Sequence, residues 1–259
     1  MRPVAIFDSG IGGLTVMHEV MERLPDLPVI FYADQAHVPY GNKTPDMIRR
    51  YMYQVMADLA PYHVQALLLA CNTATSAAAE DLRATADIPI IGMEPAVKPA
   101  VLQEAPGQKI LVSATDLTLR LDKLNRLIDD LGAGERICRV SFQRLVQFAE
   151  QGDFDSPAVY RYLEDQLSPF DMREVGALVL GCTHFIYYKP VFKALLPPSV
   201  DVLDGNEGTV KRLQSLVTYD PIGECSHSSS HPIFLVSGKP ANEQETMFFH
   251  RCLYRLKNC

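Results

Sequence analysis

The sequence predicts an α/β protein built from two similar open parallel-sheet domains. Short apolar runs alternate with helical segments along the chain, which is the pattern of parallel sheets with right-handed crossovers. The run Ala66 to Cys71 has a counterpart at Ala177 to Cys182, so the second half contains an echo of the first. The 259 residues also reach the size at which a chain tends to divide into two cores.

The repeated run is the strongest local signal. Each copy is too short for a typical helix and leads into polar side chains, so two buried strands are predicted, each ending in a thiol. A buried cysteine can serve only as a small hydrophobe, but two matched copies favour function. Open α/β sheets place their chemistry at strand ends. We therefore expect Cys71 and Cys182 to offer one acid or base to each face of a small substrate in the cleft between the domains.

The first half begins with a strand at Val4 to Phe7 and a glycine turn at Asp8 to Gly13 that opens a helix. The turn fits neither Gly-x-Gly-x-x-Gly nor a Walker loop, and Asp8 would repel a phosphate. Its N–H groups are instead expected to approach a small carboxylate, with Asp8 facing an ammonium group or a thiol. The further predicted elements are a strand at Val29 to Ala33, a turn at Val38 to Gly41, a helix from Thr44, a helix at Ala74 to Ala84 and a strand at Pro89 to Gly92.

The alternation falters between Pro95 and Gly107, a stretch with three prolines, and restarts at Lys109. The predicted elements that follow are a strand at Lys109 to Val112, a helix at Asp116 to Leu131, a strand at Ile137 to Val140, helices at Arg144 to Gln151 and Pro157 to Leu167, and a strand at Val200 to Leu203. The remaining residues are too few for a third domain and are expected to return to the first. The predicted domains are residues 1–97 with 207–259, and residues 98–206.

Composition excludes several classes of function. The formal charge is −7, from 24 basic and 31 acidic residues, and no basic run stands out, which argues against nucleic acid as a partner. No apolar segment approaches the roughly 18 residues of a membrane helix, and the short run before Asp8 leaves no room for a signal-peptide core. Six cysteines without the spacing of a disulfide scaffold predict reduced thiols in a cytoplasmic protein.

One segment carries metal-binding side chains outside the repeated runs. Cys225, His227 and His231 lie in a serine-rich stretch, but local spacing offers no fourth ligand for a zinc site. A surface loop is therefore predicted there, and no metal site is expected.

Four motifs form an ordered set: Asp8 to Leu14, Pro39 to Gly41, Ala70 to Thr75 and Gly181 to Phe185. Together they resemble the motifs of the bacterial glutamate racemases, within the aspartate/glutamate racemase superfamily. The resemblance extends from about Val4 to Leu203. Each motif alone is weak, whereas the set in this order and spacing is highly specific.

The resemblance implies racemisation of glutamate without a cofactor. One cysteine thiolate removes the Cα proton and the other thiol reprotonates the opposite face; here these are Cys71 and Cys182. Asp8 and His184 correspond to auxiliary groups, each beside one thiol, and Glu150 to a further carboxylate. The implied substrate contacts are Ser9, Pro39, Tyr40, Gly41, Asn72, Thr73, Thr115, Thr118 and Thr183. The resemblance also implies D-glutamate supply for peptidoglycan, and we expect a homodimer.

The chain departs from the family pattern at three places, and other functions compete. Leu117 replaces a glycine, Ser141-Phe142 replaces Cys-Pro, and His37 replaces an arginine. The competing functions are a racemase for another amino acid, a non-catalytic binding protein with the same fold, and a thiol-disulfide redox protein. No Cys-x-x-Cys pair supports the last of these.

Overall fold

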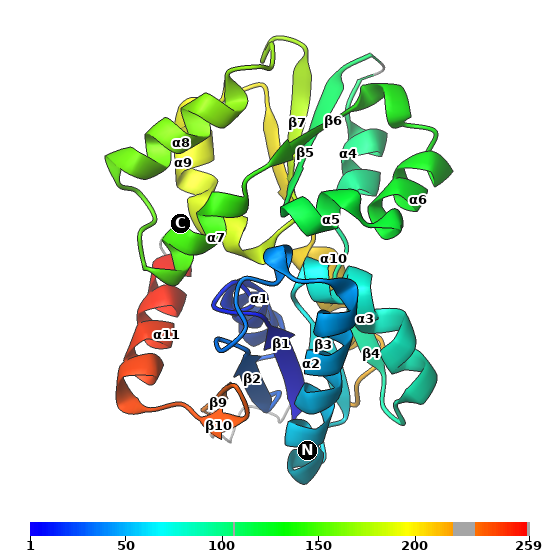
Figure 1. Cartoon of the computed structure of the whole chain (residues 1–259), viewed down its shortest axis with the longest axis vertical. Coiled ribbons are helices and arrows are strands. Elements are labelled where there is room, and N and C mark those ends of the chain that lie inside the picture. The colour runs from blue at the N-terminus through cyan, green and yellow to red at the C-terminus, as the bar shows by residue number, and fades with distance from the viewer. Residues whose placement is uncertain (106, 220–230, 258–259) are drawn as a thin grey trace.

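The computed structural model describes residues 1–105, 107–219 and 231–257 and contains two α/β units, one above the other in Figure 1. The strands are β1 Val4–Asp8, β2 Val29–Ala33, β3 Ala66–Leu69, β4 Ile90–Gly92, β5 Lys109–Ala114, β6 Ile137–Ser141, β7 Val175–Leu180, β8 Asp201–Asp204, β9 Ile233–Val236 and β10 Lys239–Pro240. They form a sheet in the order β10-β9-β2-β1-β3-β4 and a second in the order β6-β5-β7-β8. Every pairing is parallel except that of β10 with β9.

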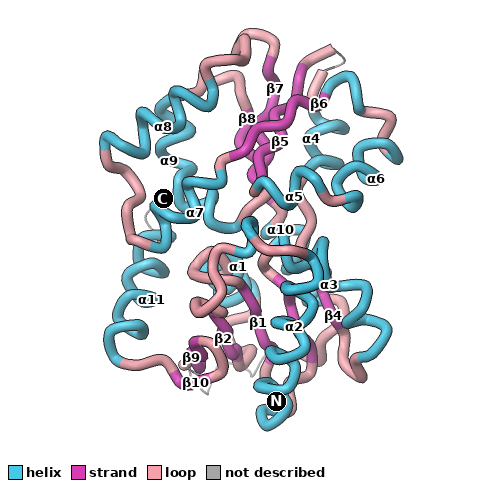
Figure 2. Tube along the Cα trace, viewed as in Figure 1, coloured by secondary structure: helices cyan, strands magenta, loops and turns pink. Residues whose placement is uncertain are grey.

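Helices cover both sheets, as the coloured tube in Figure 2 shows. The α-helices are α1 Leu14–Arg23, α2 Pro45–Leu59, α3 Asn72–Thr85, α4 Val97–Gln103, α5 Asp116–Arg120, α6 Asp122–Asp130, α7 Gln143–Glu150, α8 Pro157–Leu167, α9 Lys189–Leu195, α10 Asn206–Gln214 and α11 Glu243–Leu256. Short 3₁₀ helices lie at η1 Tyr40–Asn42, η2 Ala60–Tyr62, η3 Gly134–Arg136 and η4 Thr183–Tyr188. The predicted α/β class with parallel sheets is confirmed.

The internal repeat is visible in the strand order. The order β2-β1-β3-β4 of the first unit matches β6-β5-β7-β8 of the second, so β1 corresponds to β5 and β3 to β7. In each unit the chain leaves the central strand toward one edge and returns on the other side. The ends of β1 and β3, and of β5 and β7, are therefore topological switch points, where α/β sheets hold ligands.

The C-terminal segment lies against the first unit. Strand β9 pairs in parallel with β2, and β10 turns back along β9. Helices α10 and α11 pack on α1. We propose the boundaries 1–97 with 207–259 and 98–206 on this basis.

Two elements differ from the sequence-based expectation. The predicted helix from Asp116 to Leu131 is broken at Leu121, whose extended backbone separates α5 from α6. The break lets Leu117 pack in a core of the first unit while Leu124 packs in a core of the second. The proline-rich boundary segment also holds α4, with Pro99 in the first turn, where its missing N–H costs nothing.

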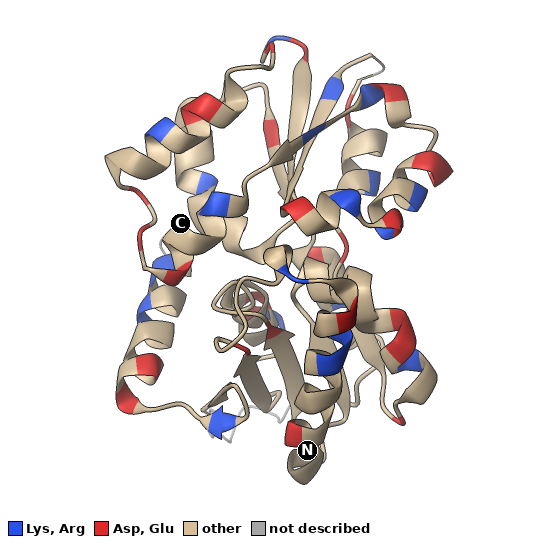
Figure 3. Cartoon of the chain, viewed as in Figure 1, with Lys and Arg blue, Asp and Glu red and all other residues tan. Residues whose placement is uncertain are grey.

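The surface carries both signs of charge. Figure 3 shows lysine and arginine interspersed with aspartate and glutamate on both units. Within the described residues, the helices are all too short or too polar to cross a membrane.

Candidate active site

The site lies where the carboxyl ends of the central strands of the two units face each other. Asp8 is the last residue of β1, and Cys71 follows the neighbouring β3 by two residues. Cys182 follows β7 by two residues, at the position in the second unit that corresponds to Cys71. The fold thus places one thiol from each repeat at its switch point.

Cys71 caps the start of α3. Its Sγ accepts a hydrogen bond from the Ala74 N–H at 3.4 Å and lies 3.8 Å from the Ser9 hydroxyl. Burial raises the pKa of the Cys71 thiol to about 12, and the negative charge of Asp8 adds to the rise. The charge of Cys182 adds a smaller rise. Cys71 is therefore a protonated thiol in this environment.

Asp8 is fully buried beside both units. Its carboxylate accepts the Gly10 N–H at 3.0 Å and the hydroxyl of Thr183, from the second unit, at 3.2 Å. Burial raises the pKa of Asp8 to about 6, against opposing effects of His184, Gly10 and Thr183. Its charge acts on Cys71, the thiol of its own unit.

Cys182 lies beside a histidine–carboxylate pair. Nδ1 of His184 is 3.8 Å from the Cys182 Sγ, and Nε2 is 2.7 Å from Oε1 of Glu150. Burial alone would lower the pKa of His184, but interactions with Cys182 and Glu150 raise it well above its usual range. The two thiols therefore have different neighbours, with an aspartate acting on Cys71 and an imidazole on Cys182.

The glycine turn packs directly onto this pair. A Cβ at Gly10 would lie 1.9 Å from Oε1 of Glu150, and a Cβ at Gly12 would lie 2.4 Å from Nδ1 of His184. Only glycine permits so close an approach. The Ile11 N–H donates to Oε1 of Glu150 at 2.8 Å. The carboxylate that the turn binds in the structure is thus the protein's own.

Three threonine hydroxyls form a ring across the two units. Oγ1 of Thr73 lies 3.0 Å from Oγ1 of Thr115 and 3.0 Å from Oγ1 of Thr118, and the last two are also 3.0 Å apart. All three residues are buried. Each hydroxyl can donate to the next, so the ring is satisfied without a ligand and offers three donors that can turn toward a carboxylate.

The turn at Pro39 to Gly41 is held in place by contacts with Asp34. The Tyr40 hydroxyl donates to Asp34 at 2.6 Å, and His37 lies 2.9 Å from the same carboxylate while stacking on Tyr51. The Tyr40 hydroxyl is therefore engaged within the first unit. A Cβ at Gly41 would lie 2.2 Å from Oε1 of Gln143, so this turn also meets the second unit.

At the site, two amide side chains each have one buried atom without a hydrogen-bond partner among the described residues. They are Oδ1 of Asn72 and Nε2 of Gln143. Such orphaned polar atoms are costly unless a ligand or water satisfies them. Asn72 was predicted from its motif, whereas Gln143 was missed, because only the folded chain brings it against Gly41.

The three departures from the family pattern have clear structural roles. Leu117 is buried in a core of the first unit, where a glycine would leave space. The Ser141 hydroxyl bonds to Asp116, and Phe142 is buried against Phe185 and Phe192. His37 braces the Tyr40 turn through Asp34.

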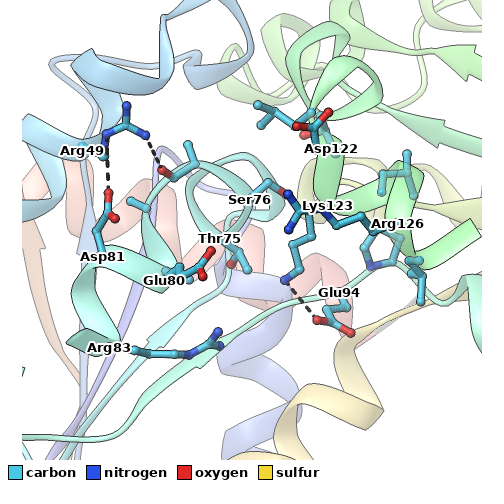
Figure 4. Close-up of a pocket in the computed structure, with 18 of the residues that line it drawn as sticks. Arg49, Thr75, Ser76, Glu80, Asp81, Arg83, Glu94, Asp122, Lys123 and Arg126 are labelled. Carbon is cyan, nitrogen blue, oxygen red and sulfur yellow. Dashed lines mark hydrogen bonds and ion pairs between the residues drawn. The ribbon is translucent and has the colours of Figure 1, made fainter. Parts of the chain in front are cut away.

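A pocket of about 670 Å³ lies beside the site rather than around the thiols. Thr118 of the hydroxyl ring is one of its lining residues, whereas Cys71 and Cys182 are not. The close-up in Figure 4 shows charged side chains along its walls, with Arg49 paired to Asp81 and Lys123 to Glu94. These two pairs account for four of the nine charged residues that line the pocket.

The described residues contain no group of three or more side chains placed to hold a metal ion. Cys225 and His227 of the serine-rich segment lie outside the described residues. The cysteines at 71, 138, 182 and 252 are free thiols.

The comparisons with known proteins agree on one family. The model for Asp/Glu/Hydantoin racemase matches residues 14–213. A glutamate racemase of Halothermothrix orenii is 44% identical over 236 residues, covering 91% of this chain and 93% of the relative. The structure of Escherichia coli glutamate racemase in complex with L-glutamate and activator UDP-MurNAc-ala matches with a TM-score of 0.82 at 27% identity, covering 99% of this chain and 96% of that one.

A third match extends the comparison to the other enantiomer. The structure of the Francisella tularensis glutamate racemase in complex with D-glutamate matches with a TM-score of 0.80 at 26% identity, covering 98% of this chain and 94% of that chain. A chain matched over so much of its length by this family model and these relatives belongs to the Asp/Glu/Hydantoin racemase family, with the glutamate racemases.

Proposed function

We propose that the protein interconverts L- and D-glutamate by proton transfer between Cα and two thiols, Cys71 and Cys182. The observation that carries the proposal is the placement of one thiol from each repeat at equivalent strand ends, each with a different auxiliary group. Racemisation requires one base for each face of Cα, and this arrangement supplies it. The substrate follows from relatives named glutamate racemase and solved in complex with each enantiomer.

The two thiols have different neighbours, which suit them to different steps of the reaction. The raised pKa keeps Cys71 as a thiol, which can donate a proton to Cα. The His184 imidazolium can donate to the Cys182 sulfur and balance the charge of a thiolate, which can remove one. Cys71 can thus serve as the acid while Cys182 serves as the base. By the family resemblance, Cys182 acts on L-glutamate and Cys71 on D-glutamate.

The α-proton of an amino acid is far less acidic than a thiol, so the site must stabilise a carbanion-like state. Donors fixed by the fold serve this purpose better than solvent, because they need no reorganisation. The proposed donors to the two substrate carboxylates are Ser9, Asn72, Thr73, Thr115, Thr118, Thr183 and the backbone N–H groups of Tyr40 and Gly41, which follow Pro39. Hydrogen bonds to charged groups contribute about 1.5–3 kcal/mol each, so a few suffice to hold a dianion.

Three further proposals rest on the resemblance. We propose that the reaction uses no pyridoxal phosphate or metal, that the enzyme is a cytoplasmic homodimer, and that its D-glutamate enters peptidoglycan. The six cysteines, which lack the spacing of a disulfide scaffold, support a reducing compartment.

Circular dichroism of purified protein with each enantiomer of glutamate and aspartate tests the proposed activity. Loss of the optical signal from both glutamate enantiomers, and from neither aspartate enantiomer, is the expected result. Activity on aspartate alone would assign the chain to another racemase, and no activity on any amino acid by folded protein would favour a binding protein. Activity should survive dialysis against EDTA, with no visible cofactor absorbance.

A further inference from the structure

The second unit holds both backbone groups of Ile11 in the glycine turn. The Tyr187 hydroxyl donates to the Ile11 carbonyl oxygen at 3.0 Å, and the Ile11 N–H donates to Oε1 of Glu150 at 2.8 Å. Oε1 of Glu150 in turn lies 2.7 Å from Nε2 of His184. Ile11 of the first unit is therefore held at both its carbonyl and its N–H by residues of the second unit.

Tyr187 and His184 act from the same side of one short helix. Both lie on η4, three residues apart, and a 3₁₀ helix repeats every three residues, so their side chains share a face. His184 reaches Ile11 through Glu150, whereas Tyr187 reaches it directly. The face of η4 that follows Cys182 thus closes a hydrogen-bonded loop onto the glycine turn.

We propose that Tyr187 is a positioning residue, which fixes the Ile11 peptide so that Glu150 holds His184 in line with Cys182. This inference rests on the proposed function, because it assigns a residue to the Cys182 half of the reaction. Tyr187 lies beyond the predicted set of site residues, and its hydroxyl reaches the machinery through Ile11.

The hydroxyl of Tyr187 is suited to holding a fixed position. Tyr187 is completely buried, so an unpaired hydroxyl or an unpaired Ile11 carbonyl would be costly. Burial also raises the pKa of Tyr187 well above its usual range, so the hydroxyl keeps its proton and remains a donor. Cys252 of α11 is close enough to influence the same hydroxyl, which ties the C-terminal helix to this point.

The role is specific to one thiol. The hydrogen-bonded chain leads from Tyr187 through Ile11, Glu150 and His184 to Cys182. Cys71 is held separately, by Ala74 and Ser9. Loss of the Tyr187 hydroxyl should therefore impair proton transfer at Cys182 more than at Cys71, whereas a general loss of packing should impair both.

The variant Tyr187→Phe removes only the hydroxyl, and Tyr32→Phe is its matched control. Tyr32 is also buried and donates to a carboxylate of Asp58 at 2.6 Å, within the first unit. The readout is elimination from each enantiomer of a glutamate analogue with a leaving group at Cβ. A thiolate removes the Cα proton, and the bond between Cβ and the leaving group breaks, with its electron pair going to the leaving group. The resulting enamine is hydrolysed to a keto acid and ammonium. Only the first proton transfer is needed.

Tyr187→Phe should slow elimination of the enantiomer that depends on Cys182 by roughly tenfold or more, since small misplacements of catalytic groups cost at least this much. Elimination of the other enantiomer should change by less than about threefold, and Tyr32→Phe should leave the ratio of the two rates unchanged. The variant Cys182→Ser first establishes which enantiomer depends on Cys182 for elimination. Equal slowing of both enantiomers by Tyr187→Phe would overturn the proposal.

A second measurement separates this inference from the proposed activity. The charges that face His184 are those of Glu150, Cys182 and Asp8. In an NMR titration of labelled histidine, Tyr187→Phe should lower the pKa of His184, because Glu150 is no longer held against it. An unchanged pKa of His184 would refute the positioning role even in an active enzyme. A wild-type protein without racemase activity would refute the proposed function and leave the titration result interpretable.

Discussion

Nε2 of His184 lies 2.7 Å from Oε1 of Glu150, and this contact turns Nδ1 of the same ring toward Cys182. The pair belongs to the second unit, yet Glu150 also accepts the N–H of Ile11 from the first. The histidine is 2% exposed, so its charge is compensated by its neighbours rather than by water. The pair therefore lies beside one thiol and joins the two units at the same point.

Glu150→Gln should lower activity by about tenfold to a hundredfold, because a hydrogen bond to a charged group contributes about 1.5–3 kcal/mol. Its effect on stability should depend on pH. The pKa of His184 is raised in the folded state, so its contribution is complete below about 6.5, the ordinary pKa of histidine, and is lost as pH rises through the folded pKa.

Urea unfolding from about pH 6 to about pH 10 measures this dependence. The difference in unfolding free energy between wild type and Glu150→Gln should be largest at the acidic end and should shrink with rising pH. A difference that grows with pH would contradict the imidazolium–carboxylate pair.

Asp8→Asn should raise the free energy of unfolding and lower the activity. The rise of the Asp8 pKa from its usual 3.8 to about 6 corresponds to about 3 kcal/mol of destabilisation once the carboxylate is ionised. In wild type this loss of stability develops as pH rises from 3.8 through about 6, so it is complete near pH 7.5. The variant should be more stable there by up to about 3 kcal/mol, with at least tenfold lower activity.

The same substitution should change the reactivity of Cys71. Because the charge of Asp8 raises the pKa of the Cys71 thiol, Asp8→Asn should lower that pKa and speed alkylation at Cys71 at a fixed pH. Mass spectrometry after iodoacetamide treatment measures the rate, and Cys138, far less buried, serves as the internal reference. Slower alkylation of Cys71 in the variant would count against this coupling.

The sequence predicts those elements and site residues that have a recognisable pattern in the neighbouring residues, such as a short apolar run followed by a polar side chain. Asp8, Cys71 and Cys182 follow short apolar strands, and parallel strands bring such ends together at one edge. The break in the helix at Leu121 has no local sequence pattern. It depends on the packing of Leu117 in one core and of Leu124 in another.

Contacts between the units are the part of the site that the sequence does not predict. Gln143 against Gly41, and Tyr187 on Ile11, join residues far apart in the chain. No sequence spacing or periodicity indicates either contact, because both form only when the two units pack together. The glycines at 10 and 12 are a weak sequence signal of contact with the second unit. A turn alone needs fewer glycines than the three found at positions 10, 12 and 13.

Gly10→Ala should uncouple the glycine turn from the carboxylate. Its Cβ would lie 1.9 Å from Oε1 of Glu150, so the Glu150 side chain must move away from Ile11 and His184. The expected destabilisation is about 1–3 kcal/mol, with a loss of activity similar to that of Glu150→Gln. Calorimetry and the racemase assay measure the two effects.

Gly208→Ala is the matched control. Gly208 lies inside α10 with nothing within 4 Å of an added Cβ, so alanine should stabilise the helix by up to about 1 kcal/mol and leave activity unchanged. If Gly10→Ala behaved like Gly208→Ala, the close approach to Glu150 would have no energetic consequence.

The last prediction separates the two thiols. A serine hydroxyl is a far poorer base than a thiolate near neutral pH, so Cys71→Ser and Cys182→Ser should each abolish nearly all racemisation. Elimination from an analogue with a leaving group at Cβ needs only one of the two bases. Cys71→Ser should keep elimination from the L-analogue and lose it from the D-analogue, and Cys182→Ser should show the reverse.

The assay is detection of the keto acid from each enantiomer, with circular dichroism in the far ultraviolet to establish that both variants fold. The two thiols have different neighbours, Asp8 acting on Cys71 and His184 on Cys182, so the surviving rates need not be equal. What matters is which enantiomer each variant still processes. Equal loss of both enantiomers in both folded variants would refute one thiol per face, whereas a reversed pattern would refute only the assignment of Cys182 to L-glutamate and Cys71 to D-glutamate.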